Sequence, residues 1–259
     1  HLALGNDAIK AHEICLRVAE KVGGVVIPPT FWAIGGMPHP WTMRFDADLM
    51  EKFFYAIFEQ LSHVGFRVII ALTGHYDIRQ FYTLKKAACD FMYKSNVLIF
   101  PIAEIELAWD KGYRGDHAGK WETSILWTLR PDLVDMNRLD KDLNKPLEGV
   151  SGEDPRVHAS KQLGQEIVNV IVDRLVQVAR RLLTNTTALD RSKFIEILEK
   201  HVRILREKRW KLGTKDYGRF LDLFWKGEYT EASKVIKAML KNEKGTLVER
   251  MEGRLRRVI

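Results

Sequence analysis

The stretch FRVIIALTG, residues 66–74, decides the fold. It is a nearly continuous apolar run that ends in glycine, which is typical of a strand buried on both faces of a sheet. Apolar residues at helical spacing precede it over 47–65 and follow it over about 78–95, and a second apolar run, NVLIFPIAEIE, occupies 96–106. Strands that alternate with helices form parallel β-α-β units. We therefore expect an α/β fold with a mostly parallel sheet sandwiched between helices.

The same alternation extends toward both ends of this region. Residues 7–22 have helical spacing, and GGVVIPP at 23–29 is predicted to be a short strand that ends at proline. Residues 140–157 have the composition of a loop, and 158–184 are expected to form one long helix. TNTTALDRS at 184–192 has the composition of a linker before further helices.

This linker divides the chain into a main domain, residues 1–185, and a basic helical appendage, residues 190–259. The appendage has much of the excess positive charge, in runs such as REKRWK (206–211) and GRLRR (253–257), and no cluster of carboxylates and histidines. Basic helices can bind nucleic acid, but a solvated helix surface is the favoured interpretation. Nucleic acid is therefore not an expected partner.

The composition limits the class of protein. The chain has 259 residues, of which 46% are hydrophobic, and a formal net charge of +7. It contains no apolar run long enough to span a membrane. Only two cysteines occur, Cys15 and Cys89, so we expect no disulfide framework and a cytoplasmic location. The chain starts at His1, without an initiating methionine or a signal-peptide pattern, so we expect further residues to precede it.

Acidic residues and histidines gather in three segments. These are HLALGND (1–7), TGHYD (73–77) and GDHAGKWETS (115–124). His75 and Asp77 directly follow the predicted strand 66–74, and ligands of open α/β sheets bind beyond the carboxyl ends of the strands. Imidazole nitrogens and carboxylate oxygens bind divalent ions. Taken singly, the residues also have structural explanations, because Asp7 and Glu122 can stabilise helix N-termini by their charge.

Taken in order, the three segments resemble the motifs of the creatininase family, which contains creatinine amidohydrolases and related deformylases. The family's first motif, roughly E-x-H-G-x-H-L-P-x-x-x-D, matches up to Asp7, and its initial Glu and His would lie before His1. The second motif, N-G-H-Y-E-N or N-G-H-G-G-N, matches residues 73–78. The third, H-[GA]-G-x-x-E-T-S, matches 117–124 throughout. The resemblance covers about residues 1–184.

This resemblance implies a metal-dependent amidohydrolase that cleaves a non-peptide C–N bond in a small cyclic amide or formamide. Two divalent ions (Zn, Mn or Fe) would activate a water molecule. Asp7 would bridge the ions, and His75 and Glu122 would complete their sites. His117 would carry a proton to the departing nitrogen, and Asp77 would be either a ligand or the base that accepts the proton of the water.

Other positions depart from the family pattern or suit contact with substrate. Thr73 and Ile78 replace asparagines of the second motif. Asp116 is available to orient the ring of His117, and the small residues around that histidine would leave room for substrate. The residues expected to contact substrate are Tyr76, Tyr113 (where the family has tryptophan), Trp109 and His39, the last in a glycine-rich loop, 34–43, that also contains Trp41.

Two alternatives to this interpretation stay open. A degenerate, non-catalytic family member would keep the fold and bind a partner through its basic helices. A deformylase-like enzyme would act on a formamide derived from a nucleotide, with Lys and Arg side chains binding phosphate. In the favoured interpretation the protein is a homo-oligomer whose partner is a small amide.

Overall fold

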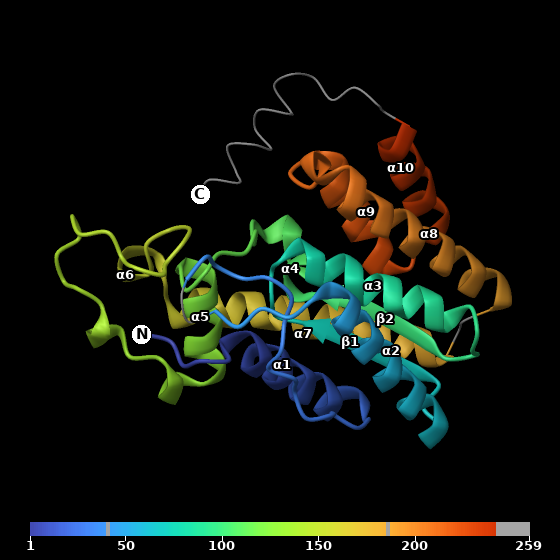
Figure 1. Cartoon of the computed structure of the whole chain (residues 1–259), viewed down its shortest axis with the longest axis horizontal. Coiled ribbons are helices and arrows are strands. Elements are labelled where there is room, and N and C mark those ends of the chain that lie inside the picture. Colours follow the sequence, from blue (N-terminus) through green and yellow to red (C-terminus); the bar gives the residue numbers. More distant parts are fainter. Residues whose placement is uncertain (40–41, 185–186, 242–259) are drawn as a thin grey trace.

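The computed structural model describes residues 1–39, 42–184 and 187–241, and the chain within these ranges is mostly helical (Figure 1). The α-helices are α1 Asn6–Val22, α2 Ala47–Val64, α3 Ile78–Met92, α4 Glu104–Leu107, α5 Lys120–Leu129, α6 Pro155–His158, α7 Lys161–Thr184, α8 Ala188–Glu207, α9 Lys215–Lys226 and α10 Tyr229–Lys241. The strands are β1 Val68–Thr73 and β2 Leu98–Ala103, and short 3-10 turns occupy Trp109–Lys111, Pro131–Leu133, Met136–Arg138 and Arg209–Lys211. None of the helices described here is long and apolar enough to cross a membrane.

The two strands form a parallel pair joined through α3, as the sequence predicts. Their register runs from Val68 opposite Leu98 to Thr73 opposite Ala103. All six residues of β2 are buried, because helices cover both of its faces. The strand predicted over 96–106 ends earlier than expected, since its last residues start α4. The α/β class is confirmed, with a sheet that is small relative to the helices.

The strand predicted over 23–29 is wrong. This part of the described chain has no strand pairing, and Gly23 and Gly24 have φ angles of 77° and 129°, which turn the chain away from an extended course. The two prolines that follow lack the N–H groups a ladder needs. Val25 and Ile27 instead line a cavity beside β1, where their side chains remain 66% and 45% exposed. An apolar run alone therefore did not identify a strand.

The expected appendage packs directly on the main domain. Figure 1 shows α8, α9 and α10 grouped together beside α3 and β2. Phe100 of β2 stacks against Phe194 of α8 and Phe224 of α9, with ring centroids 6.1 and 5.5 Å apart. Arg191 donates hydrogen bonds to three carbonyl groups at the end of α3 and in the α3–β2 connection. The hydrophobic core thus continues across the predicted domain boundary. The division into two domains stays a prediction. The basic run 253–257 lies outside the described residues.

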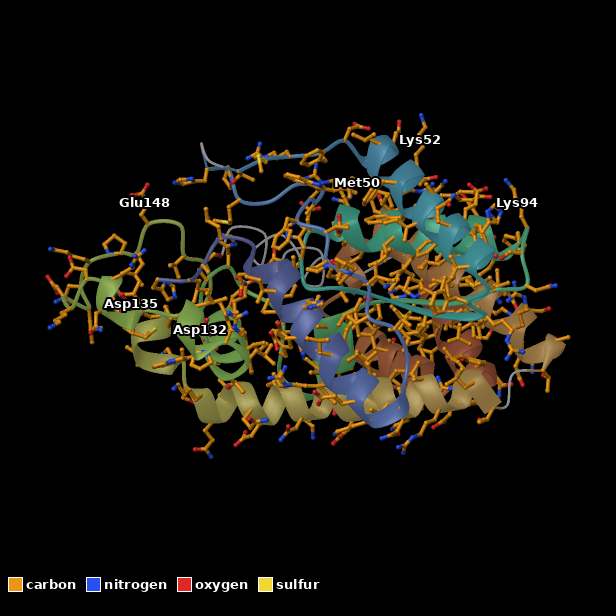
Figure 2. All side chains as sticks on the ribbon, turned by 90° about the horizontal axis from the view of Figure 1, so that it is seen from below. Met50, Lys52, Lys94, Asp132, Asp135 and Glu148 are labelled. Carbon is orange, nitrogen blue, oxygen red and sulfur yellow. The ribbon has the colours of Figure 1, made fainter. Side chains whose placement is uncertain are left out.

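Two lysines are buried in this core. Lysines such as Lys52 and Lys94 project outward from the ribbon (Figure 2), as is usual for a charged side chain. Lys10 of α1 and Lys85 of α3 are instead 0% and 1% exposed. Burying an ammonium group requires paired carboxylates, so each lysine marks a buried polar network.

Candidate active site

A cavity of about 1020 Å³ lies beside β1. Most of its described wall comes from α1, residues 22–37, α2 and β1, and the loop around 148–150, α3, α5 and α7 also contribute. Apolar side chains line the part along β1 and α2. Asp7, His75, His117 and Glu122 also line it, and His75 follows the carboxyl end of β1. This is the edge of a parallel sheet at which ligands bind.

Asp7 and His75 form a pair at this edge. Gly74 lets the start of α1 approach the end of β1, because a side chain there would place its Cβ 2.3 Å from the Asp7 carbonyl oxygen. His75 Nδ1 lies 3.0 Å from Asp7 Oδ2, and His75 Nε2 lies 2.9 Å from the Ile34 carbonyl oxygen. A carbonyl oxygen only accepts hydrogen bonds, so Nε2 is assigned the proton. Burial opposes the charged imidazolium, but the hydrogen bond and charge of Asp7 outweigh it and raise the pKa of His75.

Lys10 lies at the centre of a buried network that the sequence motifs did not reveal. Its Nζ is 3.0 Å from Glu104 Oε1, 3.1 Å from Glu122 Oε1 and 4.0 Å from Asp7 Oδ1. It also donates to the Tyr76 hydroxyl at 2.6 Å. Burial alone would lower the pKa of Lys10, but the charges of Glu104, Glu122 and Asp7 outweigh burial and raise it. The ammonium group is therefore charged at neutral pH.

A signal for Lys10 was present in the sequence. Lys10, Ile14 and Val18 are spaced by four residues on α1, and all three are buried. A lysine within the apolar stripe of a helix indicates a buried charge that needs a partner. Glu104 had a similar signal, because it interrupts an apolar run directly after β2.

Glu122 and His117 are positioned by the chain before α5. Glu122 Oε2 accepts a hydrogen bond from the Ala118 N–H at 2.8 Å, and burial raises the pKa of Glu122 to about 8 despite the charge of Lys10. Ala118 has a φ of 50°, in the left-handed region. His117 exchanges two backbone hydrogen bonds with Ser151, each 2.9 Å long, and partial burial lowers the pKa of its imidazole.

Asp116 has a role different from the one predicted. Its carboxylate accepts hydrogen bonds from the Trp121 N–H at 2.6 Å and the Glu122 N–H at 3.1 Å, so it caps the first turn of α5 in place of orienting His117. Gly119 serves the same local packing. A Cβ there would lie 2.7 Å from Asp116 and 2.9 Å from the Ser151 carbonyl oxygen, so the space it leaves is not free for substrate as expected.

Asp77 caps α3 and pairs with Arg79. Its Oδ1 accepts from the Arg79 backbone N–H at 2.8 Å and from Arg79 Nε at 3.0 Å, and its Oδ2 accepts from Arg79 Nη2 at 2.8 Å. Burial opposes the carboxylate, but these hydrogen bonds lower the pKa of Asp77. Asp77 lies outside the described lining of the cavity. Its role as ligand or base stays a prediction.

Two of the predicted substrate contacts lie in the Lys10 network. The hydroxyl groups of Tyr76 and Tyr113 contact each other, and each donates to Glu104 Oε1 at 2.7 Å. Tyr113 is 0% exposed. The structure therefore brings both hydroxyl groups together at Glu104, and substrate contact by either ring stays a prediction.

The other predicted substrate contacts lie apart from this network. Trp109 packs edge-on against Tyr217 of α9, with ring centroids 5.5 Å apart. His39 Nε2 lies 3.6 Å from Glu148, whose side chain stands on an outer loop (Figure 2). Trp41 lies outside the described residues.

The fit of a metal ion can be tested on this geometry. Across residues 1–39, 42–184 and 187–241, no group of three or more His, Cys, Asp or Glu side chains is arranged to hold one. Asp7 Oδ2 and His75 Nδ1 lie 3.0 Å apart. Two ligand atoms have this separation when each lies about 2.1 Å from one ion and the angle between them at the ion is close to 90°. The Ile34 carbonyl holds the other ring nitrogen, as partners of metal-bound histidines do. The pair fits part of a divalent site, whereas both Glu122 oxygens already have partners.

Comparison with known proteins agrees with the motif resemblance. Residues 1–179 match the family model Creatininase, described as creatinine amidohydrolase. Creatinine amidohydrolase from Pseudomonas putida is 26% identical over 166 residues, which make up 54% of this chain and 62% of that relative. The match thus spans less than two thirds of the relative's length.

Solved structures show the same fold. A creatinine amidohydrolase (creatininase) and a manganese creatininase superpose with TM-scores of 0.59 and 0.60, each at 20% identity over 72% of this chain and 86% of theirs. A creatininase variant of zinc–zinc type gives a TM-score of 0.54 at 21% identity, with the same coverage. Fold, motifs and family model agree, and the chain belongs to the creatininase family.

Proposed function

We propose that this protein is a hydrolase that uses a divalent metal ion to cleave a non-peptide C–N bond in a small cyclic amide or formamide. The observation that carries the proposal is the Asp7–His75 pair, which lies at the carboxyl end of β1 on the wall of a large cavity. Membership of the creatininase family supports the reaction class. The titles of similar structures name manganese and zinc, which supports ions of this kind here.

Asp7 Oδ2 and His75 Nδ1 are the proposed ligands. The hydrogen bond from His75 Nε2 to the Ile34 carbonyl fixes the ring so that Nδ1 faces Asp7. A bound divalent ion supplies Lewis-acid activation of the amide carbonyl and of a water molecule. Zinc, manganese and iron all suit a nitrogen and oxygen ligand set.

His117 is the proposed proton carrier. It lines the same cavity as Asp7 and His75, and its backbone is fixed by Ser151. Because its pKa is lowered, the imidazole is neutral at pH 7 and can accept a proton from water. The same ring then delivers the proton to the departing nitrogen. The apolar remainder of the cavity wall suits a small, uncharged substrate.

The alternative function is a non-catalytic binding module. It is favoured by one specific observation: Lys10 already pairs with Glu104 and Glu122, so these carboxylates do not require a metal ion. In this alternative, the basic helices from α8 onward bind a partner. The cytoplasmic location and the homo-oligomeric state stay predictions in both cases.

Metal content and turnover separate the two functions. The protein is loaded with zinc, manganese or iron, its bound metal is counted, and it is assayed on cyclic amides, including creatinine, and on formamides. We expect metal binding and turnover in the parent, and loss of both in Asp7→Asn and His75→Ala. Asp173→Asn, which removes an exposed partner of Lys21, is the matched control and should retain both. A folded parent that binds no ion and hydrolyses no substrate would favour the binding module.

A further inference from the structure

The charges around Lys10 do not sum to zero. Asp7, Glu104 and Glu122 bring three carboxylates to one ammonium group, with Nζ–O distances of 4.0, 3.0 and 3.1 Å. Negative charge therefore exceeds positive charge around Lys10, and a cation beside Asp7 would offset part of that excess.

The position of the ammonium group also matters. Glu104 is 0% and Glu122 is 3% exposed, and Lys10 Nζ contacts both carboxylates, so it occupies the place where a cation shared by them would lie. Asp7 and His75 line the cavity, with side chains 39% and 17% exposed. Glu104 Oε2 has no hydrogen-bond partner among the described residues, which agrees with a cluster that is short of positive charge.

We infer that the Lys10 ammonium fills a cation position between Glu104 and Glu122, so that no divalent ion binds there while Lys10 is present. An ion at Asp7 and His75 rests on the proposed function. The substitution of an ammonium for an ion rests on the geometry of Lys10, Glu104 and Glu122 alone. Lys10 is then a positioning residue, which holds Glu122 and Tyr76 in place without contacting the substrate.

The test counts metal ions per chain in the parent and in Lys10→Met after equilibration with manganese. We expect the variant to bind one ion more than the parent, because the vacated place lies between two carboxylates. Added manganese should also raise the melting temperature of Lys10→Met more than that of the parent. Lys10→Arg keeps the positive charge and should bind as many ions as the parent.

Lys85→Met is the matched control. Lys85 is equally buried and pairs with Glu106 at 2.7 Å, but that pair does not line the cavity. Manganese should neither bind to Lys85→Met beyond the parent level nor raise its melting temperature further.

Each outcome is decisive. A Lys10→Met variant that manganese neither loads nor stabilises beyond the parent would overturn the inference, and so would a Lys10→Arg variant that gains an ion. A parent without metal and a variant with one ion would support the role of Lys10 while removing the proposed hydrolytic function. The two proposals therefore fail in different ways.

Discussion

Two buried lysine–glutamate pairs lie on the two sides of one short helix. Lys10 pairs with Glu104 at 3.0 Å, and Lys85 pairs with Glu106 at 2.7 Å. Both glutamates belong to α4, directly after β2. All four side chains are no more than 2% exposed. The same kind of buried ion pair thus occurs twice on α4.

Their surroundings differ. Glu106 is enclosed by the appendage, where Tyr217 donates to it at 3.3 Å and His201 Nε2 lies 3.4 Å away. Glu104 shares its lysine with Glu122 and, at longer range, with Asp7, both of which line the cavity. An ion pair with matched charges and no access to the cavity serves stability. One with surplus carboxylates beside the cavity can serve binding and chemistry.

Among the residues that line the cavity, His117 should give the largest effect when it is substituted. His117→Ala should reduce kcat by a factor of about 10² to 10⁴, because proton transfer is lost. Melting temperature and metal content should stay close to those of the parent. A variant that melts several degrees lower and yet turns over at the parental rate would remove His117 from the mechanism.

Substitution of Lys85 should affect stability alone. Lys85→Met leaves Glu106 buried without its ammonium partner and should lower the free energy of unfolding by about 3–5 kcal/mol. Urea denaturation measures this loss, with Lys52→Met as an exposed control. Turnover per folded molecule should be unchanged. A large loss of turnover at parental stability would erase the distinction between the two networks.

Substitution of Tyr217 should have a smaller effect on the same enclosed network. Tyr217→Phe removes a hydroxyl group that contacts Glu106 and lies 3.0 Å from His201 Nε2. The loss of stability should be about 1–3 kcal/mol, because buried polar groups lose a partner. An unchanged urea midpoint would show that the appendage adds little to this network.

Substitution of Asp77 should have the smallest effect. Asp77→Asn keeps an oxygen that can cap α3 but loses the ion pair with Arg79, and should cost about 0.2–1 kcal/mol at pH 7. Because the folded pKa of Asp77 is lowered, its stabilisation is complete above its unfolded pKa of about 3.9 and disappears as the pH falls through the folded value. The difference between variant and parent should therefore shrink in acid. A 100-fold loss of kcat would instead support Asp77 as base or ligand.

The sequence predicted the parallel pair from local patterns, while the motif resemblance implied that Asp7 and His75 share one site. The run 66–74 identified β1, and its end placed His75 at the edge where ligands bind. The run 23–29 was misassigned, since apolar residues beside a cavity have the same pattern as a buried strand. Only the packing of the folded chain distinguishes a buried strand from an apolar segment that lines a cavity.

The Lys10 network could not be derived from motifs. Lys10 contacts Glu122, which is 112 residues away in the chain, and such a pair depends on how α1 packs against α5. Asp77 was predicted from its position in a motif, which did not show that its carboxylate pairs with Arg79. Motifs identified residues near the site, while packing determined which of them meet.

The most direct test is the location of the metal in crystals grown with manganese, by anomalous scattering. An ion is predicted about 2.1 Å from both Asp7 Oδ2 and His75 Nδ1, with Lys10 Nζ still between Glu104 and Glu122. No peak beside His75 would contradict the proposed metal site, and an ion between Glu104 and Glu122 would contradict the role of Lys10.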